Sequence, residues 1–188
     1  LCESNLYGCT IRMFEKIFKK FGIQPLFFDF TKKENLDQIS NINPALIWLE
    51  SPTNPLLKIL NIKEICKIAN SREIPVVVDN TFCTAVIQKP LELGATLSLI
   101  STTKFINGHS DALGGAVITN NELWNNKMIF AQKALGLNPS PFDCWLITRG
   151  LKTLPLRIEQ QTKNASFIVN ELRSHKLIDT LLYPFNKN

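Results

Sequence analysis

The chain has 188 residues, of which 45% are hydrophobic, 20% charged and 9% aromatic. These values are typical of ordinary globular proteins and exclude disordered, collagen-like and membrane-spanning classes. Twenty-one basic and sixteen acidic residues leave a net charge of +5, an excess that suits anion binding or solubility. The basic residues are scattered and are not interleaved with aromatic ones, so we expect no nucleic-acid partner.

The cysteine and histidine content predicts no metal centre. The five cysteines include no C-x-x-C pair, and the two histidines lie too far apart in the sequence for a zinc site. We expect reduced thiols and a cytoplasmic location. No apolar run approaches the ~20 residues of a membrane span, so no membrane partner is expected. Because the chain opens on Leu1 and not on Met, we expect a fragment of a longer protein.

Apolar segments alternate with helical patterns along the first two thirds of the chain. The first predicted helix covers Tyr7–Phe21, where apolar residues recur every three or four positions before Gly22. The next predicted elements are a strand at Pro25–Phe30, a helix at Asn35–Ile39, a strand at Ala45–Leu49, a helix at Ile62–Ala69 and a strand at Val76–Val78.

The pattern continues with two more strands and then becomes helical. The predicted elements are a short helix ending at Leu91–Gly94, strands at Leu97–Ile100 and Gly115–Ile118, helical sequence from Glu122 onward including Phe142–Thr148 and Leu154 to about Arg173, and a last apolar stretch at Leu177–Tyr183. Near-continuous apolar strands alternating with helices predict an α/β fold with a mostly parallel sheet and helices on both faces.

Polar residues follow several of these strands, where ligands bind in such sheets. Asp79 ends the Val76–Val78 strand, and a buried carboxylate there needs a cation or several hydrogen-bond donors. The structural alternative is an aspartate that caps the next turn.

The strand at Leu97–Ile100 runs into two hydroxyls and an amine. Lys104 is placed where partial desolvation would make it an amine nucleophile able to form a Schiff base; a solvated surface lysine is the structural alternative. Ser101 and Thr103 lie two positions apart, so both hydroxyls face one ligand, such as a phosphate, if the backbone is extended there.

The strand at Ala45–Leu49 breaks into a loop with two prolines. Pro52 and Pro55 each restrict their own φ and the conformation of the preceding residue, so the loop is stiff and can hold Asn54 in place. A purely structural turn is the alternative.

An amine, a carboxylate and paired hydroxyls at successive strand ends are what pyridoxal 5′-phosphate (PLP) requires. The amine binds its aldehyde, the carboxylate keeps its ring nitrogen protonated, and the hydroxyls bind its phosphate. The combination of Lys104, Asp79, Ser101 and Thr103 therefore predicts a PLP site.

The segment Ser101–Asp111 closely resembles the lysine signature of the Cys/Met metabolism PLP-dependent enzymes. Further segments match that family in order and approximate spacing: Tyr7–Thr10, Glu50–Pro55, Val78–Phe82, Pro90–Ala95 and Arg149–Leu154. The resemblance implies the large domain of the type I PLP-dependent transferases, which is like that of aspartate aminotransferase.

The resemblance also implies the role of each candidate residue. Lys104 would bind the cofactor and then carry protons between substrate carbons, and Asp79 would pair with the pyridine nitrogen. Ser101 and Thr103 would contact the phosphate.

Three more residues would surround the ring. Asn54 would lie near its phenolic oxygen, Tyr7 would stack on it and assist proton transfer, and Thr81 would support the opposite face. The catalytic residues implied are Lys104 and Tyr7.

Residues 1–188 would be part of the PLP-binding large domain, without the family's N-terminal arm, phosphate loop and C-terminal domain. The resemblance therefore implies that a chain of this extent is inactive alone and that the full-length protein, expected to be a homotetramer, acts on a sulfur amino acid.

The family contains several enzyme activities, and the motifs in residues 1–188 distinguish them poorly. Gln132–Gly136 and Gly108–Asp111 resemble the cystathionine γ-lyases and γ-synthases, whereas Cys9 resembles the methionine γ-lyases. We favour a cystathionine γ-lyase or γ-synthase; methionine γ-lyase and cystathionine β-lyase are alternatives. A truncated inactive homologue that acts in assembly, and a simple anion-binding module, are hypotheses of other classes.

Overall fold

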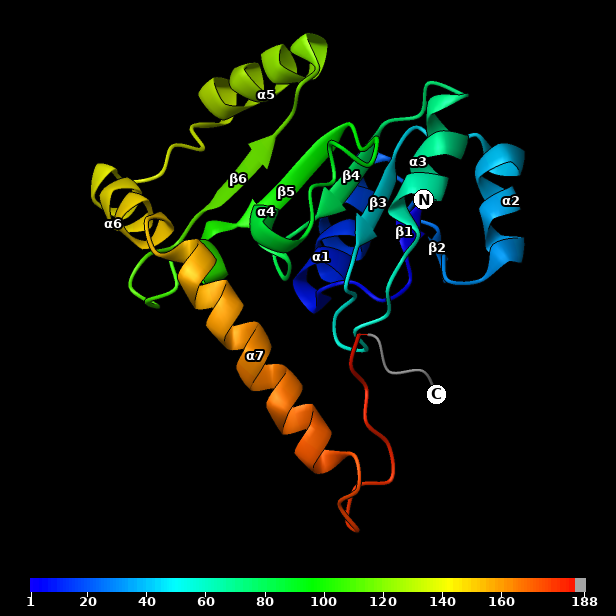
Figure 1. Ribbon diagram of the computed structural model, residues 1–188. Coiled ribbons are helices and arrows are strands. Elements are labelled where there is room, and N and C mark those ends of the chain that lie inside the picture. The colour runs from blue at the N-terminus through cyan, green and yellow to red at the C-terminus, as the bar shows by residue number, and fades with distance from the viewer. Residues whose placement is uncertain (185–188) are drawn as a thin grey trace.

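A six-stranded sheet forms the centre of the computed structural model, which describes residues 1–184 (Figure 1). Its strand order is β2-β1-β3-β4-β5-β6. The strands are β1 (Cys2–Glu3), β2 (Phe27–Phe28), β3 (Ile47–Glu50), β4 (Val76–Asp79), β5 (Leu97–Ser101) and β6 (Gly115–Ile118). All neighbouring pairs are parallel except β5 and β6. The predicted mostly parallel sheet is therefore confirmed.

Helices connect the parallel strands and then extend beyond the sheet. They are α1 (Gly8–Arg12), α2 (Lys33–Ile42), α3 (Ile62–Asn70), α4 (Thr84–Ile87), α5 (Glu122–Leu135), α6 (Pro141–Leu151) and α7 (Leu154–Leu172). After α1 the chain stays helical as a π-helical segment, Met13–Ile17, and a 3₁₀ segment, Phe18–Phe21. Gly22 ends this stretch with a φ of 84°, the left-handed conformation that glycine adopts without strain.

Both faces of the sheet are covered at the central strand β3, as the sequence predicts, whereas the edge strand β6 is largely exposed. Ile47 and Leu49 of β3 belong to a buried cluster with residues of α2 and α3. Trp48 points to the opposite face, because successive side chains of a strand alternate, and packs edge to face on Phe14 with 5.4 Å between ring centroids. Helices on two faces leave only the ends of the strands for chemistry.

Some local predictions are wrong, mostly where elements are short. Leu91–Gly94 forms successive turns closed by bonds such as Gly94 N–H to Leu91 O, and not the end of a helix. Neither β1 nor α4, which have two and four residues, is predicted from the sequence. The apolar stretch at Leu177–Tyr183, for which no helix or strand was predicted, forms neither. Elements of this length depend on pairing with distant segments, which local periodicity does not report.

No helix in the described part of the chain is both long and apolar enough to cross a membrane.

Candidate functional site

Three polar residues end neighbouring strands at the carboxyl edge of the sheet. Glu50, Asp79 and Ser101 are the last residues of β3, β4 and β5. Glu50 and Asp79 are direct partners in the parallel register, and Asp79 is paired with Leu99 of β5. The fold therefore brings two carboxylates side by side and places the segment containing Lys104 next to them.

Asp79 is buried and held by Thr81. Only 9% of Asp79 is exposed, and its Oδ1 accepts hydrogen bonds from the Thr81 hydroxyl (2.6 Å) and the Thr81 backbone N–H (3.0 Å). The Thr81 hydroxyl oxygen also accepts from the Ser101 N–H at 2.9 Å. Burial raises the pKa of Asp79, and the bonds from Thr81 oppose this shift. Asp79 thus stabilises a turn and is also a desolvated anion that a cation would stabilise.

Lys104 lies in a π-helical turn, Thr102–Ile106, that follows β5 directly. Its backbone departs from the helix, with φ −88° and ψ −120°, and its side chain is exposed. The turn begins at Thr102, so the backbone at Thr103 is helical and not extended. The extended backbone that would let both hydroxyls face one ligand is therefore absent at Thr103. Ser101 and Thr103 do not lie on one face of a strand.

The two hydroxyls have different surroundings. Ser101 is half-buried at the end of β5. The Thr103 hydroxyl accepts from the Gly114 N–H at 2.9 Å and donates to the Gly114 carbonyl at 3.3 Å. The second bond is long and therefore weak, so the Thr103 proton can turn to a stronger acceptor. The phosphate contacts of both residues stay predictions.

Tyr7 is connected to the carboxyl edge through Glu50, a residue to which the sequence analysis gave no role. The Tyr7 N–H donates to Glu50 Oε2 at 2.7 Å, while Tyr7 itself is 46% exposed just before α1. A hydrogen bond from Tyr7 to Cys9 raises the pKa of Tyr7 and lowers that of Cys9. An acidic residue at the end of an apolar strand is the signal that could have identified Glu50, as it identified Asp79.

Glu50 is itself an unusual acid. Only 4% of it is exposed, and burial raises its pKa to about 7, with a smaller contribution from the neighbouring Asp79 charge and an opposing one from the Tyr7 N–H. Two desolvated carboxylates next to each other favour the protonated form of one.

Replacing Glu50 by glutamine is expected to remove much of the pH dependence of stability of the cofactor-free, full-length protein. Between pH 4.5 and about 7 the folded state keeps a proton on Glu50 that the unfolded state has lost, so the free energy of unfolding falls as pH rises. The fall is on the order of 3 kcal/mol at most, since one pKa unit is worth ~1.4 kcal/mol. Chemical denaturation across this pH range measures it.

The matched control for this prediction is Glu171→Gln, because Glu171 is exposed near the end of α7. The control should keep the wild-type slope, and an unchanged slope in Glu50→Gln would contradict the prediction. Asp79, whose pKa is also raised, contributes a slope in the same direction.

Asn54 lies in the loop after β3 and is half-buried. The loop is fixed by fully buried Thr53, whose backbone and hydroxyl bond with Leu57 and Lys58. Lys58 in turn forms an ion pair with Asp29 at 2.6 Å. The loop is therefore anchored, as the prolines predict, and the contact between Asn54 and a ring oxygen stays a prediction.

The charges at this edge fit PLP. Within residues 1–184 Asp79 forms no ion pair with a basic side chain, so its desolvated charge lacks a cation, and a protonated pyridine nitrogen is one. Lys104 supplies an exposed amine in the adjoining turn. In that same part of the chain no group of three metal-ligating side chains occurs.

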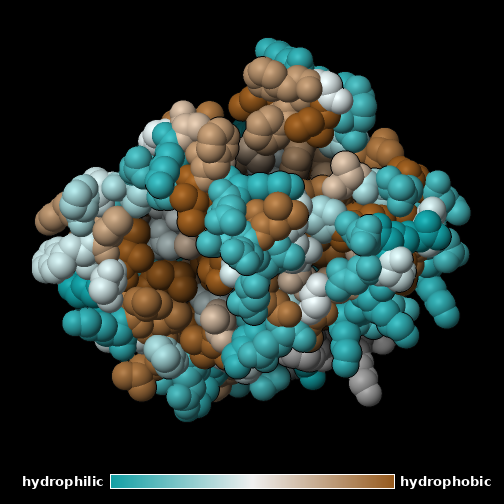
Figure 2. All heavy atoms as spheres, turned by 90° about the horizontal axis from the view of Figure 1, so that it is seen from above, coloured by the Kyte–Doolittle hydropathy of each residue, from teal (hydrophilic) through white to brown (hydrophobic). Residues whose placement is uncertain are grey.

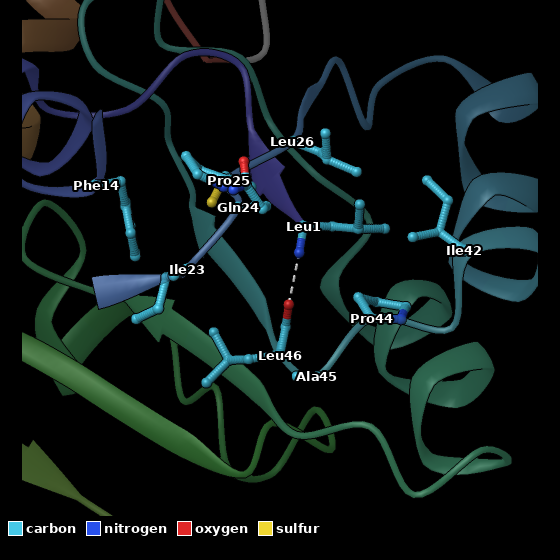
Figure 3. Close-up of a pocket in the computed structure, with 12 residues that line it drawn as sticks. Leu1, Phe14, Ile23, Gln24, Pro25, Leu26, Ile42, Pro44, Ala45 and Leu46 are labelled. Carbon is cyan, nitrogen blue, oxygen red and sulfur yellow. Dashed lines mark hydrogen bonds between the residues drawn. The ribbon is translucent and has the colours of Figure 1, made fainter. Parts of the chain in front are cut away.

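A separate apolar cavity of about 450 Å³ lies at the amino ends of β1 and β3 (Figure 3). Leu1, Leu26, Ile42 and Leu46 line it, and the Leu1 amino group donates to the Leu46 carbonyl at 2.6 Å. Since the candidate residues are at the carboxyl ends of the strands, this cavity does not belong to the site.

The comparisons with known proteins agree with this geometry. The model of the family described as "Cys/Met metabolism PLP-dependent enzyme" matches residues 1–188. A probable cystathionine γ-synthase of Herpetosiphon aurantiacus is 42% identical over 184 residues, which are 98% of this chain and 58% of the relative. A cystathionine γ-lyase of Dictyostelium discoideum is 42% identical over 96% of this chain and 46% of its own length.

Solved structures give the same result for the fold. A crystal structure of cystathionine γ-synthase from Xanthomonas oryzae pv. oryzae, in complex with aminoacrylate and cysteine, superposes with a TM-score of 0.94 at 37% identity. The match covers 97% of this chain and 47% of that one. This chain therefore spans about half the length of the relatives it matches.

Proposed function

We propose, since this chain belongs to the family of Cys/Met metabolism PLP-dependent enzymes, that the full-length protein acts at the γ-carbon of cystathionine or of a homoserine derivative. It would be a cystathionine γ-lyase or γ-synthase. The observation that carries the proposal is Asp79, a buried carboxylate that lacks a cationic partner in residues 1–184, at the same sheet edge as the turn containing Lys104.

PLP supplies, when bound, an aldehyde that reacts with amines and a protonated ring that accepts electrons from the substrate. Lys104 would bind the aldehyde through its Nζ. Once the substrate amine takes its place, the free Lys104 amine would remove the proton from the substrate α-carbon and return protons to later positions. The exposed position of Lys104 in its turn supports this movement.

Asp79 would keep the ring nitrogen protonated, because its buried charge is stabilised by a cation at that point. Thr81 would hold the Asp79 carboxylate in place and lie against the ring. Ser101 and Thr103 would bind the phosphate, and Asn54 would lie at the phenolic oxygen. The bonds from Thr81 to Asp79 and to the Ser101 backbone support a common placement for these groups.

Tyr7 would stack on the other face of the ring and assist proton transfer at the β- and γ-carbons. Its backbone is anchored by Glu50 while its side chain remains exposed, an arrangement that suits a ring meeting a ligand. After the α-carbon, the β-carbon of the substrate would lose a proton, and the γ-substituent would then leave. A thiol leaves in a γ-lyase, and an acyl-oxy group leaves before cysteine adds in a γ-synthase.

The test is to express the complete reading frame with PLP and to assay cystathionine, methionine, and an activated homoserine with cysteine in parallel. Turnover of cystathionine, or its formation from the homoserine derivative, is the expected result. Turnover of methionine alone would select the methionine γ-lyase alternative. If none of the three reacts while the cofactor is bound, the assignment to this activity is wrong.

Residues 1–188 would be part of the PLP-binding large domain, and the protein would work as a cytoplasmic homotetramer. Association is supported by α5, which has no buried residue among its 14. Its apolar side chains and those of the next loop are exposed, including Leu123, Phe130, Leu135 and Leu137. Figure 2, which views the end of the molecule where α5 lies, shows patches of apolar side chains there.

A further inference from the structure

Arg157 of α7 reaches across to the turn that contains Lys104. Its Nη1 donates to the Phe105 carbonyl at 2.7 Å, and its Nη2 donates to the carbonyls of Ile106 (3.2 Å) and Gly150 (2.8 Å). Its Nε donates to the Thr153 hydroxyl at 3.0 Å. Phe105 is the residue after Lys104, so a single half-buried guanidinium joins the lysine turn to the junction of α6 and α7.

The Phe105 and Ile106 carbonyls lie at the end of a helical turn, where backbone carbonyls lack partners within the helix. The Gly150 carbonyl also accepts from the Thr153 N–H and hydroxyl. The turn closes with the bonds Asn107 N–H to Thr102 O and Gly108 N–H to Lys104 O, and the chain then departs from the helix. Since Lys104 has a non-helical ψ of −120°, helix geometry alone does not fix its orientation. Arg157 binds the next two carbonyls, those of Phe105 and Ile106.

Two glycines allow this close approach. Gly108 has a φ of +71°, and a Cβ at that position would overlap the Arg157 guanidinium. A Cβ on Gly150 of α6 would overlap the backbone of Asn107. The turn containing Lys104 therefore packs directly against α6 and α7, and the Arg157 guanidinium lies at this contact.

We propose that Arg157 is a positioning residue for Lys104. By binding the carbonyls of Phe105 and Ile106, it holds the Lys104 side chain in the orientation needed for proton transfer. This inference rests on the proposed function. Lysine cannot replace arginine here, because one ammonium cannot span the same carbonyls and the Thr153 hydroxyl as a planar guanidinium does. A change that keeps the charge therefore tests the geometry.

The experiment compares Arg157→Lys with wild type in the full-length protein. In the cofactor-free protein, amide hydrogen exchange over residues 105–114 should become about tenfold faster, because local opening becomes easier. In the PLP-loaded protein, kcat per bound cofactor should fall about 10²-fold, the effect of a misplaced reacting group. KM should change little, and the pH profile of the cofactor absorbance should shift.

Two further variants keep the result interpretable. Thr153→Val removes one bond that orients Arg157 and should change the same quantities in the same direction by a smaller factor, which serves if Arg157→Lys does not fold. Arg72→Lys is the matched control, because Arg72 is exposed after α3, and should match wild type in every measurement.

The failure of this inference differs from the failure of the proposed function. If borohydride does not attach PLP to Lys104 in wild type, the proposed function fails whatever the variants do. If wild type is labelled there but Arg157→Lys and Thr153→Val keep the kcat per bound cofactor and the pH profile, Arg157 does not position Lys104. That conclusion holds even where the variants are less stable.

Discussion

Replacing Lys104 by alanine in the full-length protein is expected to abolish covalent attachment of PLP on borohydride reduction. Turnover of the sulfur amino-acid substrate should fall at least about 10³-fold, since the variant loses both the amine for the aldehyde and the group that carries protons. Mass spectrometry of the reduced, digested protein and a steady-state assay measure the two effects.

Lys63→Ala is the control, because Lys63 is exposed on α3 and has no role in the candidate site. It should be labelled and active like wild type. Lys104→Arg should resemble Lys104→Ala in turnover, because a guanidinium stays protonated and cannot act as a base. A label mapped to a different lysine in wild type would overturn the assignment of this residue.

Replacing Asp79 by asparagine is expected to separate stability from chemistry. The variant should lose turnover by about 10²-fold or more, because a neutral amide does not favour a protonated ring nitrogen over an unprotonated one. The cofactor-free variant should be at least as stable as wild type at pH 7, since it no longer buries an ionised carboxylate. Activity assays and chemical denaturation measure the two quantities.

The sign of the stability effect follows from the pKa of Asp79. Burial raises this pKa above the usual aspartate value of 3.8, so between these two pKa values the folded state holds a proton that the unfolded state has already released. The free energy of unfolding therefore falls as pH rises from the pKa of the unfolded state to that of the folded state, and it stays reduced at higher pH. Asp37→Asn, at an exposed position on α2, should change neither quantity. Marked destabilisation by Asp79→Asn would indicate a structural role alone.

The strands that carry the candidate site were predictable because they are mostly buried. Val76–Val78 is apolar at every position, and a run of this kind bounded by a polar residue indicates a central parallel strand. The buried carboxylate of Asp79 and the amine of Lys104 could be placed from the ends of such strands.

The remaining parts of the site depend on contacts between segments that are distant in the chain. Glu50 binds the Tyr7 N–H across 43 positions, and Arg157 binds the Phe105 carbonyl across 52. Arg157 does not stand out in its own segment, and the position of Glu50 at the end of an apolar strand does not indicate that it binds Tyr7. The π-helical turn at Thr102–Ile106 was also missed, because Ser101 and Thr103 are compatible with an extended backbone until Gly114 binds the Thr103 hydroxyl.

The shared direction of β3, β4 and β5 has a consequence for how this protein tolerates mutation. Because these strands are parallel and adjacent, residues such as Ile65 and Val76 support the packing, while the reactive groups are at one edge. In a saturation library scored for both protein abundance and specific activity, the variants should therefore fall into two groups according to their position. Variants in the helical layer should lower abundance, and those at the edge should lower activity at normal abundance. Selection can then alter either property with little effect on the other.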